Sequence, residues 1–391
     1  MNKNLSLLPA SATITLADRI RTLKCAGKEI VALQTGDPDF PTPAPIVEAA
    51  YKAIRDGLTH YSDSSGLPVL RQAIAEKILS ENGGLYDPGT EILVTNGGVH
   101  AYYCALAAIV NPGDEVLVPD PSWMTHVNTV AMLGGVPKRV ASNIEQEFWP
   151  AIDEIEKTIS PKTVALVLNS PNNPTGAVAS FSYLQQIVDL AQRHGLYIIS
   201  DEVYEYILFD EAKHISLAKF KKQYKKIIIV NSFSKSYAMT GWRIGYLAAP
   251  EKVISIALKA SQNTITNVAS FIQMAALSAL TDAGVKKIVE KMMEGYAVRR
   301  NSALDLLKRS ESQIYAFKPK GAFYLFINVE NMRKSSAEIA ECLLNEAQIA
   351  MVPGSVYGHY GEGFLRMTLA ASETSIEKGL NGLIKWGRKP L

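Results

Sequence analysis

Five short polar segments follow predicted β-strands and carry residue types that catalysis requires. They are NGG (96–98), PSW (121–123), SPNNPTG (170–176), SDEVY (200–204) and NSFSK (231–235), and the next turn carries TGWR (240–243). Each has an ordinary explanation when taken alone, because Gly-Gly and Asn-Pro sequences favour turns and a single aspartate or lysine is usually solvated. Together they supply a glycine-rich helix start, a carboxylate, a flat aromatic ring and an amine.

The strands that precede these segments are predicted to form one mostly parallel sheet. Strand candidates cover 91–95, 114–120, 163–171, 196–202, 226–233 and 245–250, with helical stretches near 99–110, 122–133, 180–194 and 251–280. Strands that alternate with helices of this length form βαβ crossovers, and unbroken apolar runs such as 227–230 indicate that helices cover both faces. Because ligands bind beyond the carboxyl ends of such strands, the polar segments are expected to meet at one edge.

The two ends of the chain have a different pattern. Residues 1–46 are rich in proline around GDPDFPTPAP, which favours extended chain over helix. After about residue 285, a long helical pattern leads into a strand (AFYLFINV), a helix, a second strand (FLRMTLA) and a final helix. We expect an α/β fold, with a large domain over 47–285 and a smaller α+β domain formed from 1–46 together with 286–391.

Composition and absent motifs exclude several classes of protein. The 391 residues include 40 Lys and Arg against 38 Asp and Glu, a net charge of +2 that argues against a nucleic-acid partner. The longest apolar run, 101–110, is about half of what spans a membrane. Three distant cysteines indicate a reducing compartment, and Pro9 interrupts the weak signal-like start, so a cytoplasmic location is expected. Neither dinucleotide-binding, P-loop nor metal motifs are found, and no metal site is predicted.

The combination of polar groups matches what pyridoxal phosphate requires, namely backbone N–H groups for the phosphate, a carboxylate for the ring nitrogen and a lysine for the aldehyde. The segments SPNNPTG, SDEVYE and SFSKSYAMTGWRIGY closely resemble the class I/II aminotransferases, the aspartate-aminotransferase-like group of fold-type-I pyridoxal-phosphate enzymes. The resemblance continues in the same order through SAT (11–13), TGDPDF (35–40), HYSDSSGLPVLRQAI (60–74) and FLRMTLA (364–370). It implies ping-pong transfer of an amino group between an L-amino acid and a 2-oxo acid, with 2-oxoglutarate as the usual second substrate, in a homodimer with shared active sites.

The resemblance also implies a role for individual residues. Lys235 would form a Schiff base with the cofactor and then move the Cα proton of the substrate, while Asp201 keeps the pyridine nitrogen protonated. His126 resembles the residue that orients Asp201, although a hydrogen-bonded core histidine remains an alternative. The other implied cofactor-binding residues are Asn173 and Tyr204 at the ring oxygen, Trp123 on the ring face, Gly98, Val99, Ser232, Ser234 and Arg243 at the phosphate, and Tyr61 from the partner subunit.

Substrate binding is implied for residues from both ends of the chain. Arg366 resembles the arginine that holds the substrate α-carboxylate, a task for a planar fork that lysine could not copy. Gly36 would offer a backbone N–H to the same carboxylate, and Trp123 and Asn173 would also contact the substrate. Asp37 is expected to serve only as part of its loop.

This chain departs from the family pattern in the turn GGVH (97–100). Relatives specific for aspartate often carry a lysine where this chain has Val99, and loss of that charge-assisted contact costs an acidic donor roughly 1.5–3 kcal/mol. Aspartate and neutral or aromatic amino acids therefore all remain candidate donors, and an arginine of the partner subunit could restore acidic specificity. Two alternatives of other classes stay open: a C–S β-lyase of the same fold, which would release pyruvate and ammonia, and a non-enzymatic effector that binds pyridoxal phosphate.

Overall fold

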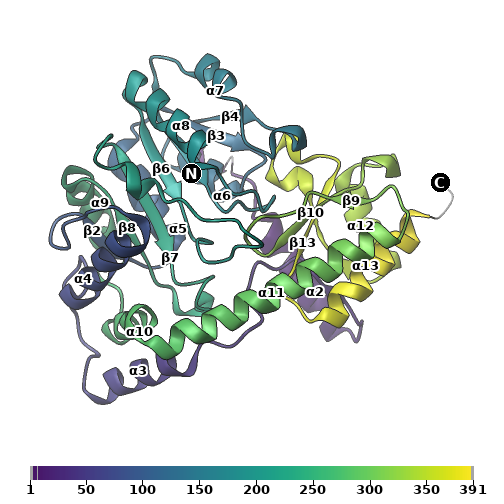
Figure 1. Ribbon diagram of the computed structural model, residues 1–391, viewed down its shortest axis with the longest axis horizontal. Helices are drawn as coiled ribbons and strands as arrows, with labels where there is room; N and C mark the ends of the chain where they lie inside the picture. Colours follow the sequence, from purple (N-terminus) through teal and green to yellow (C-terminus); the bar gives the residue numbers. More distant parts are fainter. Residues whose placement is uncertain (1–2, 7, 389–391) are drawn as a thin grey trace.

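A computed structural model describes residues 3–6 and 8–388. Its two larger sheets lie on opposite sides of the molecule, and the long helix α11 (Ala283–Arg309) extends from one to the other (Figure 1). None of the helices in the described ranges combines the length and apolar character that crossing a membrane requires.

The larger sheet has seven strands in the described part of the chain. Their spatial order is β2 (Ile92–Thr95), β8 (Gly245–Ala248), β7 (Ile227–Ser232), β6 (Tyr197–Asp201), β5 (Thr163–Asn169), β3 (Glu115–Asp120) and β4 (Val136–Ala141). Strand β8 runs antiparallel to both β2 and β7, and all other neighbours are parallel. The mostly parallel sheet expected from the sequence is thus confirmed.

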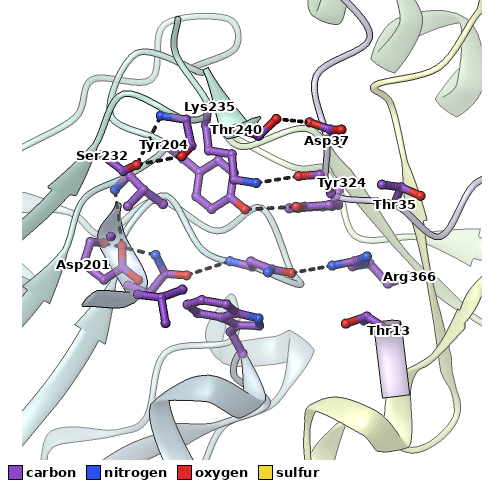
Figure 2. A pocket seen from close by; sticks show the side chains of 18 of the residues that line it. Thr13, Thr35, Asp37, Asp201, Tyr204, Ser232, Lys235, Thr240, Tyr324 and Arg366 are labelled. Carbon is purple, nitrogen blue, oxygen red and sulfur yellow. Dashed lines mark hydrogen bonds between the residues drawn. The ribbon is translucent and has the colours of Figure 1, made fainter. Parts of the chain in front are cut away.

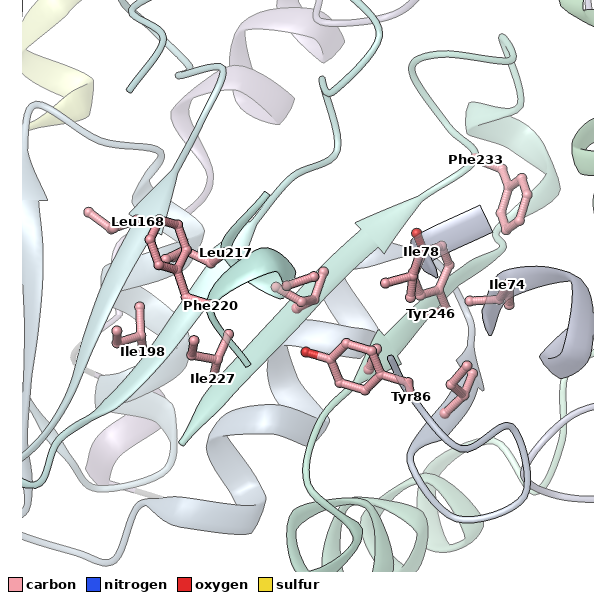
Figure 3. Packing of buried hydrophobic residues seen from close by; sticks show 14 of the residues in the cluster. Ile74, Ile78, Tyr86, Leu168, Ile198, Leu217, Phe220, Ile227, Phe233 and Tyr246 are labelled. Atoms are coloured by element: carbon pink, nitrogen blue, oxygen red, sulfur yellow. The ribbon is translucent and has the colours of Figure 1, made fainter. Parts of the chain in front are cut away.

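Helices cover both faces of this sheet, which explains why its central strands are mostly apolar ahead of the polar residues at their carboxyl ends. Alternate side chains of a strand point to opposite faces, so Ile199 packs with α5 (Gly98–Ile109) and α9 (Glu251–Thr264), whereas Ile198 packs on the other side with α8 (Phe181–His194). The cluster that contains Ile198 also includes residues of three more helices: α3 (Ala44–Arg55), α4 (Pro68–Lys77) and α10 (Ser270–Thr281). Part of this cluster is shown in Figure 3. The remaining helices near this sheet are α6 (Met124–Met132) and α7 (Ile152–Thr158).

The smaller sheet is antiparallel and is built from the C-terminal part of the chain. Its order is β12 (Val352–Pro353), β13 (Phe364–Thr368), β10 (Tyr324–Asn328) and β9 (Tyr315–Ala316). Helices α11, α12 (Ser336–Glu346) and α13 (Glu373–Gly387) contribute to its core. The N-terminal segment, with α1 (Lys3–Ser6) and α2 (Ala12–Cys25), joins this part through parallel pairing of β1 (Val31–Ala32) with β11 (Ile349–Ala350). The proposed domain boundaries, 47–285 against 1–46 with 286–391, remain a prediction.

Several elements differ from the sequence expectation, and three of them have a clear physical reason. Strand β4 was not expected because VPKRVA contains Pro137 and two cations, which an edge strand tolerates. The stretch 251–280 is interrupted between α9 and α10, where Thr266 adopts a φ of 66°. Helix α2 precedes the extended proline-rich segment, and its single buried residue, Ile20, explains why its apolar pattern is weak.

The antiparallel strand β8 brings one more segment to the carboxyl edge of the larger sheet. Its first residue, Gly245, pairs with Thr95 at the end of β2 and with Ser232 at the end of β7. A Cβ atom at Gly245 would lie 2.9 Å from backbone atoms of Gly97 and Gly98, so glycine permits the close approach of the α5 start. The TGWR turn, which precedes β8, therefore lies at the same edge as the segments that follow the parallel strands.

Candidate active site

A cavity of about 300 Å³ lies between the carboxyl edge of the larger sheet and the smaller sheet (Figure 2). The residues predicted from the sequence that line it are Gly36, Gly98, Val99, Trp123, Asn173, Asp201, Tyr204, Ser232, Ser234, Lys235, Arg243 and Arg366. His126 lies behind the wall against Asp201, and Tyr61 is 88% exposed outside the cavity. The fold thus brings together segments that are more than 300 residues apart in the chain.

The amine at the cavity wall is Lys235, three residues beyond the end of β7. Its Nζ donates a hydrogen bond to the carbonyl oxygen of Gly36 at 2.5 Å. Desolvation lowers the pKa of Lys235 to about 8, against the opposing charge of Asp37 and with a smaller contribution from the positive charge of Arg366. The neutral form of this amine is therefore far more populated near physiological pH than in an ordinary lysine, although the protonated form still predominates.

The buried carboxylate is Asp201 at the end of β6. His126 Nε2 lies 2.9 Å from Asp201 Oδ2, and both residues are buried. The His126 backbone carbonyl accepts a hydrogen bond from the Tyr102 hydroxyl at 2.9 Å, and the Trp123 ring meets the imidazole edge to face at 5.4 Å. The position of Asp201 is therefore fixed by a histidine that is itself held on several sides.

An anion-binding end of the cavity lies at the start of α5. The first N–H groups of a helix have no acceptor within the helix, and its dipole favours negative charge there. Ser232 and Ser234 lie beside this start with their hydroxyls 2.8 Å apart, and Arg243 is anchored by a hydrogen bond from Nη1 to the Thr240 carbonyl at 2.8 Å. Two hydroxyls, a guanidinium and the first N–H groups of α5 form a donor set that fits a phosphate.

Behind that end, an ion-pair network supports Ser232. The Ser232 N–H donates to Asn231 Oδ1 at 2.7 Å, and Asn231 Nδ2 donates to Glu205 at 2.7 Å. Glu205 pairs with the buried Lys77. Glu205, Glu202 and His214 bring three potential metal-ligand atoms within 4.8 Å of one another, but Lys77 and Asn231 already satisfy Glu205.

The opposite wall of the cavity carries the guanidinium of Arg366 and a pair of tyrosine hydroxyls. Arg366, on β13, donates from Nη1 to Asn173 Oδ1 at 3.1 Å and from Nη2 to the Gln34 carbonyl, while Nε has no hydrogen-bond partner among the described residues. The Tyr204 and Tyr324 hydroxyls lie 2.9 Å apart. Burial raises the pKa of Tyr204 well above its usual value, so this hydroxyl stays protonated at neutral pH.

The structure adds cavity residues that sequence reasoning missed. Tyr324, Thr35 and Thr240 line the wall, and Asp37, expected only as loop, accepts a hydrogen bond from Thr240 Oγ1 at 2.6 Å. Asp37 and Thr240 are 203 residues apart, so no local pattern links them. The signal for Tyr324 was its hydroxyl in a strand whose other polar residue is Asn328.

Comparison with known proteins identifies the family. A sequence model of the family "Aminotransferase class I and II" matches residues 28–383. An aspartate aminotransferase of Pyrococcus abyssi is 41% identical over 92% of both chains, and aromatic-amino-acid aminotransferase 2 of Thermococcus litoralis is 41% identical over 91% of both. The solved structure of aspartate aminotransferase from Thermus thermophilus with maleate is 36% identical, with a TM-score of 0.94 over 98% of this chain and 99% of that one.

These matches confirm the resemblance predicted from the sequence, and with it the fold type, the enzyme class and the cofactor. The cavity is consistent with them, because it offers a donor set for the phosphate, a carboxylate for the ring nitrogen and an amine for the aldehyde of one cofactor. The chain therefore belongs to the class I and II aminotransferases, fold-type-I transferases that depend on pyridoxal phosphate.

Proposed function

We propose that this aminotransferase takes the amino group of an L-amino acid and passes it to a 2-oxo acid in two half-reactions at this one cavity. Aspartate or a neutral or aromatic amino acid is the donor, and 2-oxoglutarate is the second substrate. The observation that supports this most strongly is the desolvated Lys235 amine in the same cavity as the buried Arg366 guanidinium. One group handles a proton, and the other binds the carboxylate that every such substrate carries.

We assign cofactor binding to the residues at the carboxyl edge of the larger sheet. When bound, pyridoxal phosphate supplies an aldehyde that takes the substrate nitrogen and a ring that accepts the electron pair left at Cα. Asp201 would hold a proton on the ring nitrogen, with Asn173 and Tyr204 at the ring oxygen and Trp123 on the ring face. The phosphate would lie against Gly98, Val99, Ser232, Ser234 and Arg243.

Side chains of the protein would bind the substrate carboxylate and transfer the proton. Arg366 would exchange its contacts with Asn173 and Gln34 for a bidentate grip on the α-carboxylate, assisted by the Gly36 N–H. The Lys235 amine would then take the proton from the substrate Cα. Because its pKa lies close to neutral pH, the same group can return a proton in the reverse direction.

We also propose a homodimer in the cytoplasm. Helix α3 and the segment after it expose a row of apolar side chains at helical spacing, namely Val47, Tyr51, Ile54 and Leu58, followed by the highly exposed Tyr61. A second copy of the chain would cover this row, and the partner's Tyr61 would reach the phosphate. The cytoplasmic location is supported by the three cysteines, all of which are free thiols.

Replacement of Lys235 tests the proposed reaction. Lys235→Ala should lower the rate of oxo-acid formation from an amino donor by about 10²–10⁴-fold or more, because the proton transfer loses its base. Rapid mixing of holoenzyme with single L-amino acids measures this half-reaction, and Lys378→Ala, an exposed lysine on α13, serves as the control. Undiminished turnover in Lys235→Ala, or ammonia release in place of amino transfer by the wild type, would contradict the proposal.

The lowered pKa of Lys235 predicts how cofactor uptake depends on pH. Only the neutral amine attacks an aldehyde, so the uptake rate of cofactor-free protein should rise with pH and level off above about 8. Asp37→Asn should move the midpoint lower, because the Asp37 charge raises the pKa of Lys235. Absorbance after mixing with pyridoxal phosphate measures the rate, and a rise that continues toward the ordinary lysine value of 10.5 would refute this account.

Val99 predicts the donor preference of the enzyme. Val99→Lys should raise kcat/KM for aspartate relative to phenylalanine about ten- to a hundredfold, since a charge-assisted contact contributes roughly 1.5–3 kcal/mol. Val99 lines the cavity and is 43% exposed, so a longer side chain can be accommodated. Val99→Met provides a control of similar length without charge, and equal behaviour of the two variants would show that position 99 does not recognise the donor side chain.

The apolar row on α3 predicts the oligomeric state. The double variant Tyr51→Glu with Ile54→Glu should be a monomer that binds pyridoxal phosphate more weakly, because Tyr61 of the partner subunit no longer reaches the site. Sedimentation velocity and cofactor titration measure the two effects. Val298→Glu, which changes an apolar side chain 53% exposed on α11, should remain dimeric; a monomeric wild type would overturn the assignment.

A further inference from the structure

A buried carboxylate at the end of β3 joins the larger sheet to a loop of the smaller one. Asp120 is 2% exposed and accepts hydrogen bonds from Arg139 Nε at 2.7 Å and from the backbone N–H groups of His359 at 3.1 Å and Tyr360 at 3.2 Å. The last two residues lie in the segment that connects β12 to β13. This side chain of the larger sheet therefore anchors the connecting segment.

Arg139, on β4, holds the same segment at a second point. Its Nη2 donates to the carbonyl oxygen of Tyr357, which also accepts the Ser122 N–H at 3.0 Å. Between these anchors Gly358 adopts a φ of 134°, and a Cβ atom there would lie 2.0 Å from both Arg139 Nη2 and Asp120 Oδ1. Only glycine fits this conformation and this close approach.

The segment between β12 and β13 places the ring of Tyr357 against Arg366, the proposed substrate-binding arginine. Tyr357 is 1% exposed, and the Arg366 guanidinium carbon lies 5.3 Å from its ring centroid and 4.4 Å from that of Tyr324. Arg366 Nε has no hydrogen-bond partner among the described residues, so stacking on these rings contributes to the orientation of the guanidinium plane. Movement of Tyr357 would therefore change the direction in which the Arg366 guanidinium points.

We propose that Asp120 and Arg139 are positioning residues for carboxylate binding, which act by holding Tyr357 against Arg366. This inference rests on the proposed role of Arg366. Neither residue of the pair lines the catalytic cavity. Their effect should therefore appear in substrate binding, while the chemistry at Lys235 and Asp201 is left intact.

Asp120→Asn tests this inference with the smallest change of shape. Two carboxylate oxygens accept three donors in the native chain, whereas an asparagine offers one accepting oxygen and turns an NH₂ group toward the remaining donors. KM for the amino donor and for the 2-oxo acid should both rise about 3- to 30-fold. The value of kcat and the absorption spectrum of the holoenzyme should stay within about twofold of the native values.

The same strand offers a matched control. Glu115, at the other end of β3, pairs with Lys138 of β4 at 3.5 Å and accepts a hydrogen bond from Ser160 at 2.6 Å. Glu115→Gln removes the same charge from the same pair of strands, far from Tyr357. It should leave both KM values unchanged, even if the melting temperature falls as much as in Asp120→Asn. Arg139→Lys, which keeps the charge but loses the fork, should raise KM as Asp120→Asn does.

Binding of carboxylates that cannot react separates this inference from the proposed function. Calorimetric titration of the holoenzymes with maleate and with 3-phenylpropionate should give a Kd that rises in Asp120→Asn by the same factor as KM. Values of KM and Kd in Asp120→Asn that match those in Glu115→Gln would overturn the inference alone, because the pair would then only stabilise the fold. A wild type that neither transaminates nor binds these carboxylates would overturn the proposed function and this inference together.

Discussion

The desolvation of one lysine amine is the condition on which the chemistry of this site depends. Removal from water favours the neutral amine and lowers the pKa of Lys235 to about 8. Arg366 and Arg243 act in the same direction, while the carboxylates of Asp37 and Asp201 act against them. This balance keeps the amine near its pKa at neutral pH, where a single group can both remove and return a proton.

The architecture follows from the need to bring this amine, an anion-binding helix start and a carboxylate-binding arginine together. Parallel strands deliver Asp201 and Lys235 to one edge, and the reversed strand β8 brings Arg243 to the same edge. Arg366 comes from the other sheet, so the site exists only while the two sheets are held together. Thr42 donates a hydrogen bond to the Ala238 carbonyl, Thr240 donates one to Asp37, and the N–H groups of residues 359 and 360 donate to Asp120. These contacts contribute to that connection.

Much of this could be predicted from the sequence because the signals are local. Apolar runs such as those ending at Asp201 and Ser232 indicate buried parallel strands, and the polar residues that follow them must then meet at one edge. Strand β4 was not predicted, because it lies at the sheet edge, where a strand can contain the proline and the charges that hide its pattern. The contacts of Asp37 with Thr240, of Tyr204 with Tyr324 and of Asp120 with His359 join segments more than a hundred residues apart, and single-sequence patterns contain no information about such pairs.

Identification of the lysine that becomes joined to the cofactor tests the assignment of Lys235 most directly. Borohydride reduction of the holoenzyme, followed by peptide mapping, should place a single stoichiometric label on the peptide that contains Lys235, and the protein before reduction should be yellow. A protein that stays colourless with added pyridoxal phosphate, or a label on a peptide from another part of the chain, would contradict the account.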